Sequence, residues 1–376
     1  MSDRTNSLLE RPIRFGIIGC GALGLVHAKR LSAIPGVTIT ALSDPDEDAM
    51  RRVSIALGGG VPLFADYRAL LDSGALDAVC INSPNRWHVE QLLASLDRGL
   101  HVLCEKPLSM VPAEVEQVVA ATERAGTTVA IAYQSRYRRD SRILKRALES
   151  GRWGRVTSVS VFTCEDWMTP NRGTWRHDPT RCPGGFFADA NGHQLDLLFW
   201  LTGLEATAVR AMIETRGTPV PMVTWGEARL VANPAVGSGQ SAIGEGQSVG
   251  NRQSAIGKRD SVRNLQSKSQ NGEGVPFTFT FVGDAKHWRE EISIQTERAD
   301  FVMQDTRLRW SDGSAPAGPY PDPESNAPVG VDADTPDIAF VAAMRGGPPV
   351  VSPPGTVWPV LNFTLAALDA AKDGSW

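Results

Sequence analysis

The stretch Ile13-Arg14-Phe15-Gly16-Ile17-Ile18-Gly19-Cys20-Gly21-Ala22-Leu23-Gly24 decides the fold of this chain. An apolar run of strand length ends in the pattern G-x-G-x-x-G and passes directly into helical spacing over residues 23–34. In that context the first glycine permits a tight turn, the second lets backbone approach a pyrophosphate, and the third allows close packing of the helix. We therefore predict a dinucleotide-binding turn, whose cofactor-lining residues are Gly19, Gly21, Ala22, Leu23 and Gly24.

The alternation of strand and helix continues through the first third of the chain. Buried strands are predicted over residues 13–18, 37–42, 78–81, 101–104 and 128–132. Helices are predicted over residues 23–34, 46–57, 87–98 and 112–125, and Gly36, Gly99 and Gly126 follow three of them as stops. Such alternation is typical of a parallel sheet covered on both faces. The sequence therefore predicts an α/β domain with a doubly wound Rossmann fold over residues 10–133.

The rhythm changes after Tyr133, and we assign residues 134–376 to a second, α+β domain. Helices are predicted over residues 141–150, about 186–202 with Gly203 as its stop, 336–344 and 357–371. Strands are predicted over residues 156–162, 277–282, 290–296, 301–304 and 308–310, and their polar alternation indicates antiparallel pairing. Residues 232–274 are rich in Gly, Ser and Gln without an aromatic, so we expect a disordered insertion there.

Composition and charge exclude several classes of partner. The chain has 376 residues with 38 basic and 42 acidic side chains, so it has no basic surplus to neutralise nucleic acid or an anionic membrane. No apolar run reaches the roughly eighteen residues of a membrane-spanning helix, and residues 1–10 hold no run of signal-peptide length. The five cysteines form no C-x-x-C pair, so we expect reduced thiols, no metal site and a cytoplasmic protein that binds a small molecule.

An acidic residue stands at the end of the second predicted strand, in Leu42-Ser43-Asp44-Pro45-Asp46. A carboxylate at this place can accept both ribose hydroxyls of NAD and repels the extra phosphate of NADP. We therefore expect Asp44 to bind the cofactor and NAD to be preferred over NADP. The alternative is that Asp44 or Asp46 caps the following helix, and both roles are compatible.

Two further segments follow the third and fourth predicted strands: Asn82-Ser83-Pro84-Asn85-Arg86-Trp87-His88 and Cys104-Glu105-Lys106-Pro107. Ligands of open α/β sheets bind outside the carboxyl ends of the strands, so both segments face the expected cofactor crevice. Pro107 disfavours a helical conformation at Lys106 and so fixes how its ammonium is presented. A solvated surface charge is the alternative interpretation of this lysine.

The third segment that contains candidate catalytic residues is Pro183-Gly184-Gly185-Phe186-Phe187-Ala188-Asp189-Ala190-Asn191-Gly192-His193-Gln194-Leu195-Asp196. On one continuous helix, Asp189 and His193 would share a face, which Asp196 and Trp200 would extend. A carboxylate one turn from an imidazole can orient it and raise its basicity, as a general base needs. An ordinary Asp and His pair on a solvated face is the alternative.

Taken together, these three segments resemble the glucose-fructose oxidoreductase, inositol dehydrogenase and rhizopine-catabolism family (Gfo/Idh/MocA). The resemblance is carried by the glycine turn at 19–24, by Glu105-Lys106-Pro107, and by Gly184-Gly185 leading to Asp189 and His193. It runs from about residue 13 to residue 203 and more loosely beyond. It implies a Rossmann domain followed by an α+β domain with an open, mostly antiparallel sheet that pairs between subunits, so a homodimer or homotetramer is expected.

The resemblance also implies roles for particular residues. The family pattern makes Lys106, Asp189 and His193 the catalytic set. Positions that line the cofactor are Ser83, Pro84, Asn85, His88, Glu105 and Gln134. Positions near the substrate are Lys106, Tyr133, Arg136, Trp175 and Arg176, to which the loop 163–181 adds Trp167 as a residue that can stack on a sugar ring. Pro183 and Asn191 depart from glycines of the family and put the substrate in doubt more than the chemistry.

Three functions are compatible with these residues. The first, which we favour, is an NAD-dependent dehydrogenase of a sugar, inositol or related cyclic polyol, with His193 as the base and Lys106 stabilising the alkoxide. The second is redox-neutral cleavage of a glycoside or an elimination, assisted by a bound nicotinamide. The third is a non-catalytic sugar or nucleotide sensor, which would be expected to have lost Lys106 or His193; both are present.

Overall fold

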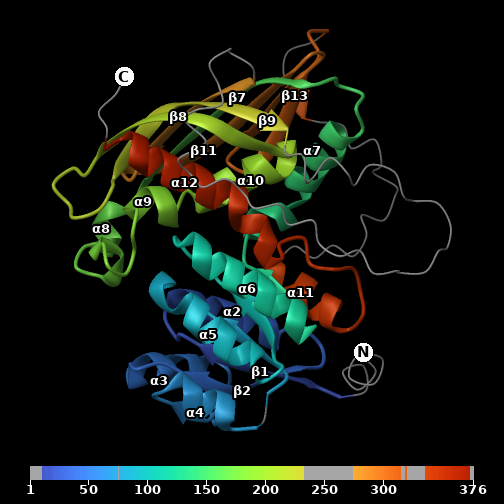
Figure 1. The fold of residues 1–376 in the computed structure, drawn as a ribbon. Helices are drawn as coiled ribbons and strands as arrows, with labels where there is room; N and C mark the ends of the chain where they lie inside the picture. The colour runs from blue at the N-terminus through green and yellow to red at the C-terminus, as the bar shows by residue number, and fades with distance from the viewer. Residues whose placement is uncertain (1–10, 75, 233–273, 315–317, 320–334, 373–376) are drawn as a thin grey trace.

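The computed structural model describes residues 11–74, 76–232, 274–314, 318–319 and 335–372. The predicted insertion at 232–274 lies outside the described residues except at its two ends. In the described part, two sheets form separate layers, with sheet A at the bottom and sheet B at the top of Figure 1.

Sheet A is parallel, with the strand order β3-β2-β1-β4-β5-β6. Its strands are β1 (Ile13–Ile18), β2 (Val37–Ser43), β3 (Leu63–Phe64), β4 (Ala78–Ile81), β5 (His101–Cys104) and β6 (Val129–Ile131). The helices around it are α2 (Ala22–Ser32), α3 (Glu47–Ala56), α4 (Tyr67–Asp72), α5 (His88–Leu96) and α6 (Pro112–Ala125). The predicted doubly wound α/β fold is confirmed.

The strand order of sheet A changes direction at β1: β2 and β3 lie on one side of β1, and β4 to β6 lie on the other. In open α/β sheets a ligand crevice opens at this switch point, beyond the carboxyl ends of the strands. The glycine turn after β1 and the segments after β4 and β5 therefore meet at one edge of sheet A. The sequence interpretation missed only the short elements β3 and α4 in this region.

Sheet B has the strand order β14-β13-β12-β11-β7-β10-β9-β8 in the described residues. Its strands are β7 (Val156–Asp166), β8 (Leu204–Glu214), β9 (Val223–Ala232), β10 (Val275–Val282), β11 (Asp284–Thr296), β12 (Asp300–Gln304), β13 (Arg307–Ser311) and β14 (Gly318–Pro319). Neighbouring strands run antiparallel except β10 and β7, which are parallel. The prediction of a mostly antiparallel sheet is confirmed.

One face of sheet B is apolar and carries the helices of this layer. Phe277, Phe279 and Phe281 of β10 are buried there and pack on Phe187 and Phe363. The helices are α7 (Arg139–Glu149), α8 (Met168–Asn171), α9 (Gly185–Asp189), α10 (Gly192–Thr202) and α12 (Trp358–Ala370). Figure 1 shows α9, α10 and α12 between the two sheets. The helices thus separate sheet B from the carboxyl edge of sheet A.

The prediction of one continuous helix over 186–202 is wrong. The helix is interrupted between α9 and α10, where the Asn191 side chain donates a hydrogen bond to the Phe186 carbonyl (2.9 Å) and is fully buried. An amide side chain that bonds a nearby carbonyl competes with the helical hydrogen-bond pattern. As a consequence, Asp189 and His193 lie on different helices and do not form the simple one-turn pair expected.

Between sheet B and α12, the chain returns to the Rossmann layer. Helix α11 (Pro336–Met344) packs on α2, and its Phe340 contacts Phe15 of β1 edge to face with ring centroids 6.1 Å apart. Phe340, Val341 and Met344 are buried in the same core as β1 and β2. No helix within the described residues is long and apolar enough to cross a membrane.

Candidate active site

The glycine turn has the geometry that a bound pyrophosphate needs. Gly19 has a φ of +87°, and a Cβ there would lie 2.6 Å from the Asn82 carbonyl carbon. A Cβ at Gly24 would lie 2.0 Å from the Gly19 oxygen, so only glycine lets α2 start this close to β1. A Cβ at Gly21 would meet open space, in front of the α2 N-terminus. This cradle of free N–H groups fits an anionic diphosphate.

The Asp44 carboxylate stands beside this turn. Its Oδ2 accepts a hydrogen bond from the Cys20 backbone N–H (2.7 Å), and its Oδ1 accepts one from the Asp46 N–H (2.9 Å). The cap of α3 is Asp46, which accepts from the N–H groups of Asp48 and Ala49. Asp44 is therefore not the helix cap, and its carboxylate lies next to the glycine turn.

The loop after β4 contains several of the residues predicted to line the cofactor. Ser83 donates through its hydroxyl to Gln91 (2.6 Å), while Pro84 and Asn85 are partly exposed beside it. The His88 ring is fully buried, with its two nitrogens 2.8 Å from the carbonyl oxygens of Pro107 and Ser83. His88 therefore holds the loops after β4 and β5 together, and its ring is not available to a cofactor.

Lys106 reaches from sheet A to the helices of sheet B. Lys106 Nζ donates to the Asp189 carbonyl oxygen (2.9 Å) and lies 3.6 Å from Asp189 Oδ1. The other oxygen of Asp189 binds Arg176 Nε at 2.9 Å. Burial would raise the pKa of Asp189, but the charges of Lys106 and Arg176 lower it. Asp189 is thus an anion that contacts two cations. Its side chain accepts a hydrogen bond from Arg176, whereas we expected it to orient His193.

His193 is adjacent to this ion group. A Cβ at Gly192 would lie 4.0 Å from Lys106 Cδ, which places the lysine stem against the start of α10, one residue before His193. Burial, followed by the charge of Lys106, lowers the pKa of His193 to about 3. The carboxylates of Glu105 and Asp189 do raise the pKa of His193, as expected, but burial and Lys106 outweigh them. The ring is neutral at neutral pH and can accept a proton, and its buried Nδ1 has no hydrogen-bond partner among the described residues.

Several predicted substrate residues are engaged elsewhere. Arg136 is buried and forms a two-point ion pair with Asp196 (2.8 and 2.5 Å), and Tyr133 is buried beside it. Trp167 is buried against Phe186. Of the remaining candidates, Trp175, Arg176 and Gln134 are partly exposed, and the Arg176 guanidinium lies over the Trp175 ring at 4.4 Å.

Sequence reasoning missed a second group of charged residues, which lies near Lys106 and Asp189. On the inner face of sheet B, Glu290 of β11 lies opposite Thr163 of β7 and binds Arg138 at 3.0 Å and Gln194. Glu165 follows two residues after Thr163, so it lies on the same face. The alternation of β7 could have indicated this placement, since Val159, Val161 and Thr163 are all buried.

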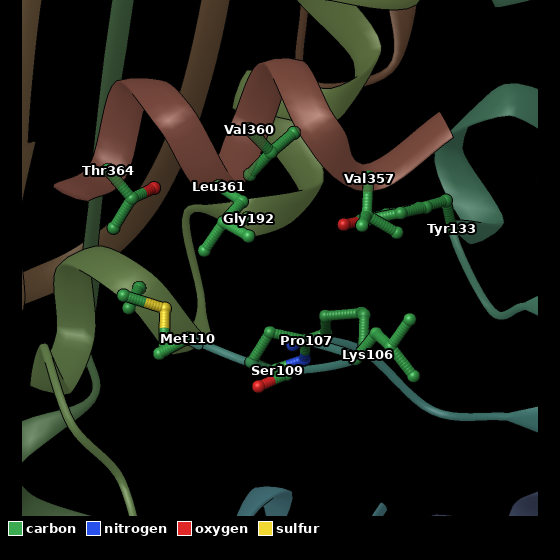
Figure 2. A pocket seen from close by; sticks show the side chains of 12 residues that line it. Lys106, Pro107, Ser109, Met110, Tyr133, Gly192, Val357, Val360, Leu361 and Thr364 are labelled. Atoms are coloured by element: carbon green, nitrogen blue, oxygen red, sulfur yellow. The ribbon is translucent and has the colours of Figure 1, made fainter. Parts of the chain in front are cut away.

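A small pocket lies between the loop after β5 and helix α12. Figure 2 shows Val357, Val360 and Leu361 above it and Lys106 with Pro107 below it. The rest of its lining is Leu108, Ser109, Met110, Tyr133, Ala188, Gly192 and Thr364. Most of these groups are apolar and offer few hydrogen bonds to a polyol. The pocket therefore places mostly apolar groups next to the aliphatic part of the Lys106 side chain.

Comparison with known proteins follows the same division of the chain. Residues 13–133 match the model of the Gfo/Idh/MocA oxidoreductase family with an NAD-binding Rossmann fold, and residues 141–243 match the C-terminal domain model of that family. The two matches together span more than half of the chain. The protein belongs to the Gfo/Idh/MocA family of oxidoreductases, which confirms the resemblance drawn from its three motifs.

Individual relatives are distant. The chain is 31% identical to myo-inositol 2-dehydrogenase of Thermotoga maritima over 53% of this chain and 58% of the relative. It is 33% identical to inositol 2-dehydrogenase of Streptomyces avermitilis over 52% of this chain and 55% of the relative. These alignments span little more than half of the relatives' length. In fold, it is similar to an oxidoreductase domain protein from Kribbella flavida, with a TM-score of 0.75 and 20% identity over 97% of this chain and 98% of the other.

Proposed function

We propose that this protein is an NAD-dependent dehydrogenase that oxidises a CH–OH group of a sugar, inositol or related cyclic polyol. The observation that carries the proposal is the contact of Lys106 with the turn between α9 and α10, because it brings an ammonium and a neutral imidazole to one place. The inositol dehydrogenases among the relatives support the same class of substrate. The glycine cradle and Asp44 support NAD as the cofactor.

The residues divide the work of alcohol oxidation between them. When bound, NAD accepts the hydride that leaves the carbinol carbon. His193, neutral and short of a partner on Nδ1, accepts the hydroxyl proton. Lys106 donates a hydrogen bond to the same oxygen and stabilises its developing negative charge. Asp189 fixes the lysine head and is itself fixed by Arg176.

A substrate screen tests this proposal. Purified protein is mixed with NAD and a panel of inositols and aldoses, and the absorbance of the reduced nicotinamide is followed. Accumulation of reduced cofactor with at least one polyol is expected. Product release without reduced cofactor would instead show redox-neutral chemistry, and binding of a polyol without turnover would show a sensor; either outcome contradicts the proposal.

The charge of Glu165 predicts which polyols are accepted. Burial raises the pKa of Glu165, Lys106 opposes this, and the described residues give its carboxylate no hydrogen bond or ion pair. A carboxylate at this place repels sugar acids and phosphorylated sugars, so we propose a neutral or amine-bearing substrate. In Glu165→Gln, the ratio of kcat/KM for a uronate to kcat/KM for the matching neutral sugar is expected to rise about tenfold, equivalent to ~1.4 kcal/mol.

The matched control for this change is Glu227→Gln. Glu227 is exposed on β9 and pairs with Arg210, so its loss should leave the ratio unchanged. An unchanged ratio in Glu165→Gln would show that this carboxylate does not face the substrate.

The position of Asp44 predicts the choice between NAD and NADP. Asp44→Asn keeps an oxygen for the Cys20 N–H but removes the charge that repels a 2′-phosphate. The preference for NAD over NADP, measured as the ratio of the two dissociation constants, should fall about tenfold. Asp46→Asn retains an oxygen at the α3 cap and is the control that should keep the wild-type ratio. Equal ratios in both variants would contradict the role of Asp44.

We also propose that the protein is a cytoplasmic homodimer or homotetramer. The five cysteines are free and buried, as is usual in a reducing compartment. The outer face of sheet B points away from the helices in Figure 1, and Thr278 and Glu227 on it are exposed. A second subunit on this face would cover the sheet, in keeping with the family resemblance.

A further inference from the structure

A buried chain of three side chains links the last part of the sequence to the catalytic loop. His27 of α2 lies between two carboxylates: its Nδ1 is 2.6 Å from Asp337 Oδ1, and its Nε2 is 3.0 Å from Glu105 Oε1. The other oxygen of Glu105 accepts a hydrogen bond from the Lys106 backbone N–H at 3.0 Å. The path therefore runs without a gap from α11, through α2, to the residue that carries the catalytic ammonium.

All members of this chain are removed from solvent. Asp337 is completely buried, His27 is 2% exposed and Glu105 is 8% exposed. Two buried carboxylates against one imidazole favour the charged form of the ring, because an uncompensated buried anion is costly. A neutral ring could also donate to only one of its two carboxylates, whereas the imidazolium donates to both.

The titratable groups that face His27 are the carboxylates of Asp337 on α11 and Glu105 after β5 and the Cys80 thiol on β4. One more charge lies nearby, because the Arg30 guanidinium of α2 is 3.8 Å from Asp337 Oδ2. Burial opposes a charge on His27, but the hydrogen bonds to Asp337 and Glu105 favour it, and the pKa of His27 lies well above the usual value. Burial raises the pKa of Cys80, so the thiol stays protonated at neutral pH and carries no charge toward His27.

Glu105 responds in the opposite direction. Burial alone would raise its pKa, yet the hydrogen bond and charge of His27 lower it to about 2. Glu105 is therefore an anion whose two oxygens are both committed, one to the imidazolium and one to the Lys106 backbone. Two buried contacts, with His27 and with the Lys106 backbone, therefore hold the Glu105 carboxylate in place.

We propose that Asp337, more than two hundred residues away in sequence, is a positioning residue for the catalytic lysine, acting through the imidazolium of His27 and the carboxylate of Glu105. This inference rests on the proposed dehydrogenase function for its kinetic consequence, but the chain itself can be measured without substrate. In this proposal helix α11 covers sheet A and also supplies Asp337, which holds the loop of Lys106 in place through His27 and Glu105. The docking of α11 is coupled to the placement of the Lys106 ammonium.

The first test needs no substrate. Nitrogen NMR of the histidine rings in the full chain, at about pH 8, reports the charge of His27 above its ordinary pKa. Both ring nitrogens of His27 should be protonated in the wild type and only one in Asp337→Asn. A neutral His27 in the wild-type protein would overturn the proposal whether or not any polyol is oxidised.

The second test separates positioning from simple docking. Asp337→Asn should lower kcat about tenfold with KM for the polyol changed less than twofold. Its rate should also fall as the pH rises through the lowered pKa of His27, a limb absent from the wild type. The matched control is Arg345→Gln at the other end of α11, where Arg345 donates to the Pro35 carbonyl (2.7 Å) and does not contact the chain.

Both variants remove one contact of α11 with the Rossmann layer, and both should lose some stability. Only Asp337→Asn should change kcat and the pH profile. Equal kinetics in the two variants, with lower melting temperatures in both, would show that Asp337 merely docks the helix and would overturn the proposal. A third outcome is that His27 is charged but neither the wild type nor any variant oxidises a polyol. That result would contradict the proposed function and would still support the charged chain of Asp337, His27 and Glu105.

Discussion

His193→Ala should lose between about a hundredfold and ten-thousandfold in turnover while still binding NAD. In the proposed mechanism the imidazole accepts the hydroxyl proton, because it is neutral at neutral pH and lies next to the Lys106 stem. The dissociation constant of NAD should stay within about twofold, since the glycine turn and Asp44 are untouched. Steady-state kinetics and cofactor titration on the same preparation measure both quantities.

A stability signature accompanies this kinetic effect. His193 has a lower pKa in the folded protein than the ordinary value near 6.5, so the unfolded state binds more protons between about pH 6.5 and pH 3. The contribution of this group is present above pH 6.5 and is lost as the pH falls through that window. His193→Ala should therefore lose less stability on acidification than the wild type does.

The matched control is His287→Ala, because His287 is exposed on β11. It should keep both the turnover and the pH dependence of the wild type. Full activity in His193→Ala would remove the imidazole from the proposed chemistry. A wild-type pH dependence of stability in that variant would show that the ring is not held neutral.

Lys106→Met should lower kcat about a hundredfold to a thousandfold, as is typical when a donor to a developing oxyanion is removed. The thioether chain replaces the stem that lies against the apolar pocket and Gly192. Asp189 keeps Arg176 as its cation, so the anion is not left unpaired. The loss is therefore expected in turnover more than in folding, which kcat and the melting temperature together measure.

The pH profile of the residual activity identifies the cause. The ammonium is the second contributor, after burial, to the low pKa of His193. Without it that pKa rises, so the acid limb of the rate profile should move to higher pH in Lys106→Met. Lys29→Met, an exposed lysine on α2, should leave the profile unchanged. An acid limb that stays in place would mean that the two groups do not share a site.

The sequence predicted the Rossmann layer well because its signals are local. The bounds of β1, β4, β5 and α6 agree with prediction at both ends, since the strands are mostly apolar runs and Gly126 ends its helix in a left-handed conformation. The glycine turn needs only a strand before it and a helix after it. Family membership followed from three such local motifs in the expected order.

The features that prediction missed depend on distant partners. The break before α10 is made by a hydrogen bond of Asn191, while the apolar spacing of the helix continues through it. The parallel pairing of β10 with β7 joins strands more than a hundred residues apart. Arg136 was assigned to the substrate because sequence gives no sign of its ion pair with Asp196. Likewise, no local pattern connects Asp337 to His27.

The central claim is that Lys106 and His193 act on one substrate oxygen held against the nicotinamide. A crystal structure of the protein with NAD and the polyol selected by the screen tests this directly. The account predicts that Lys106 Nζ and a ring nitrogen of His193 both lie within about 3.2 Å of the hydroxyl oxygen on the carbon nearest the nicotinamide. Two nitrogens that contact different hydroxyl groups, or that face different cavities, would contradict it.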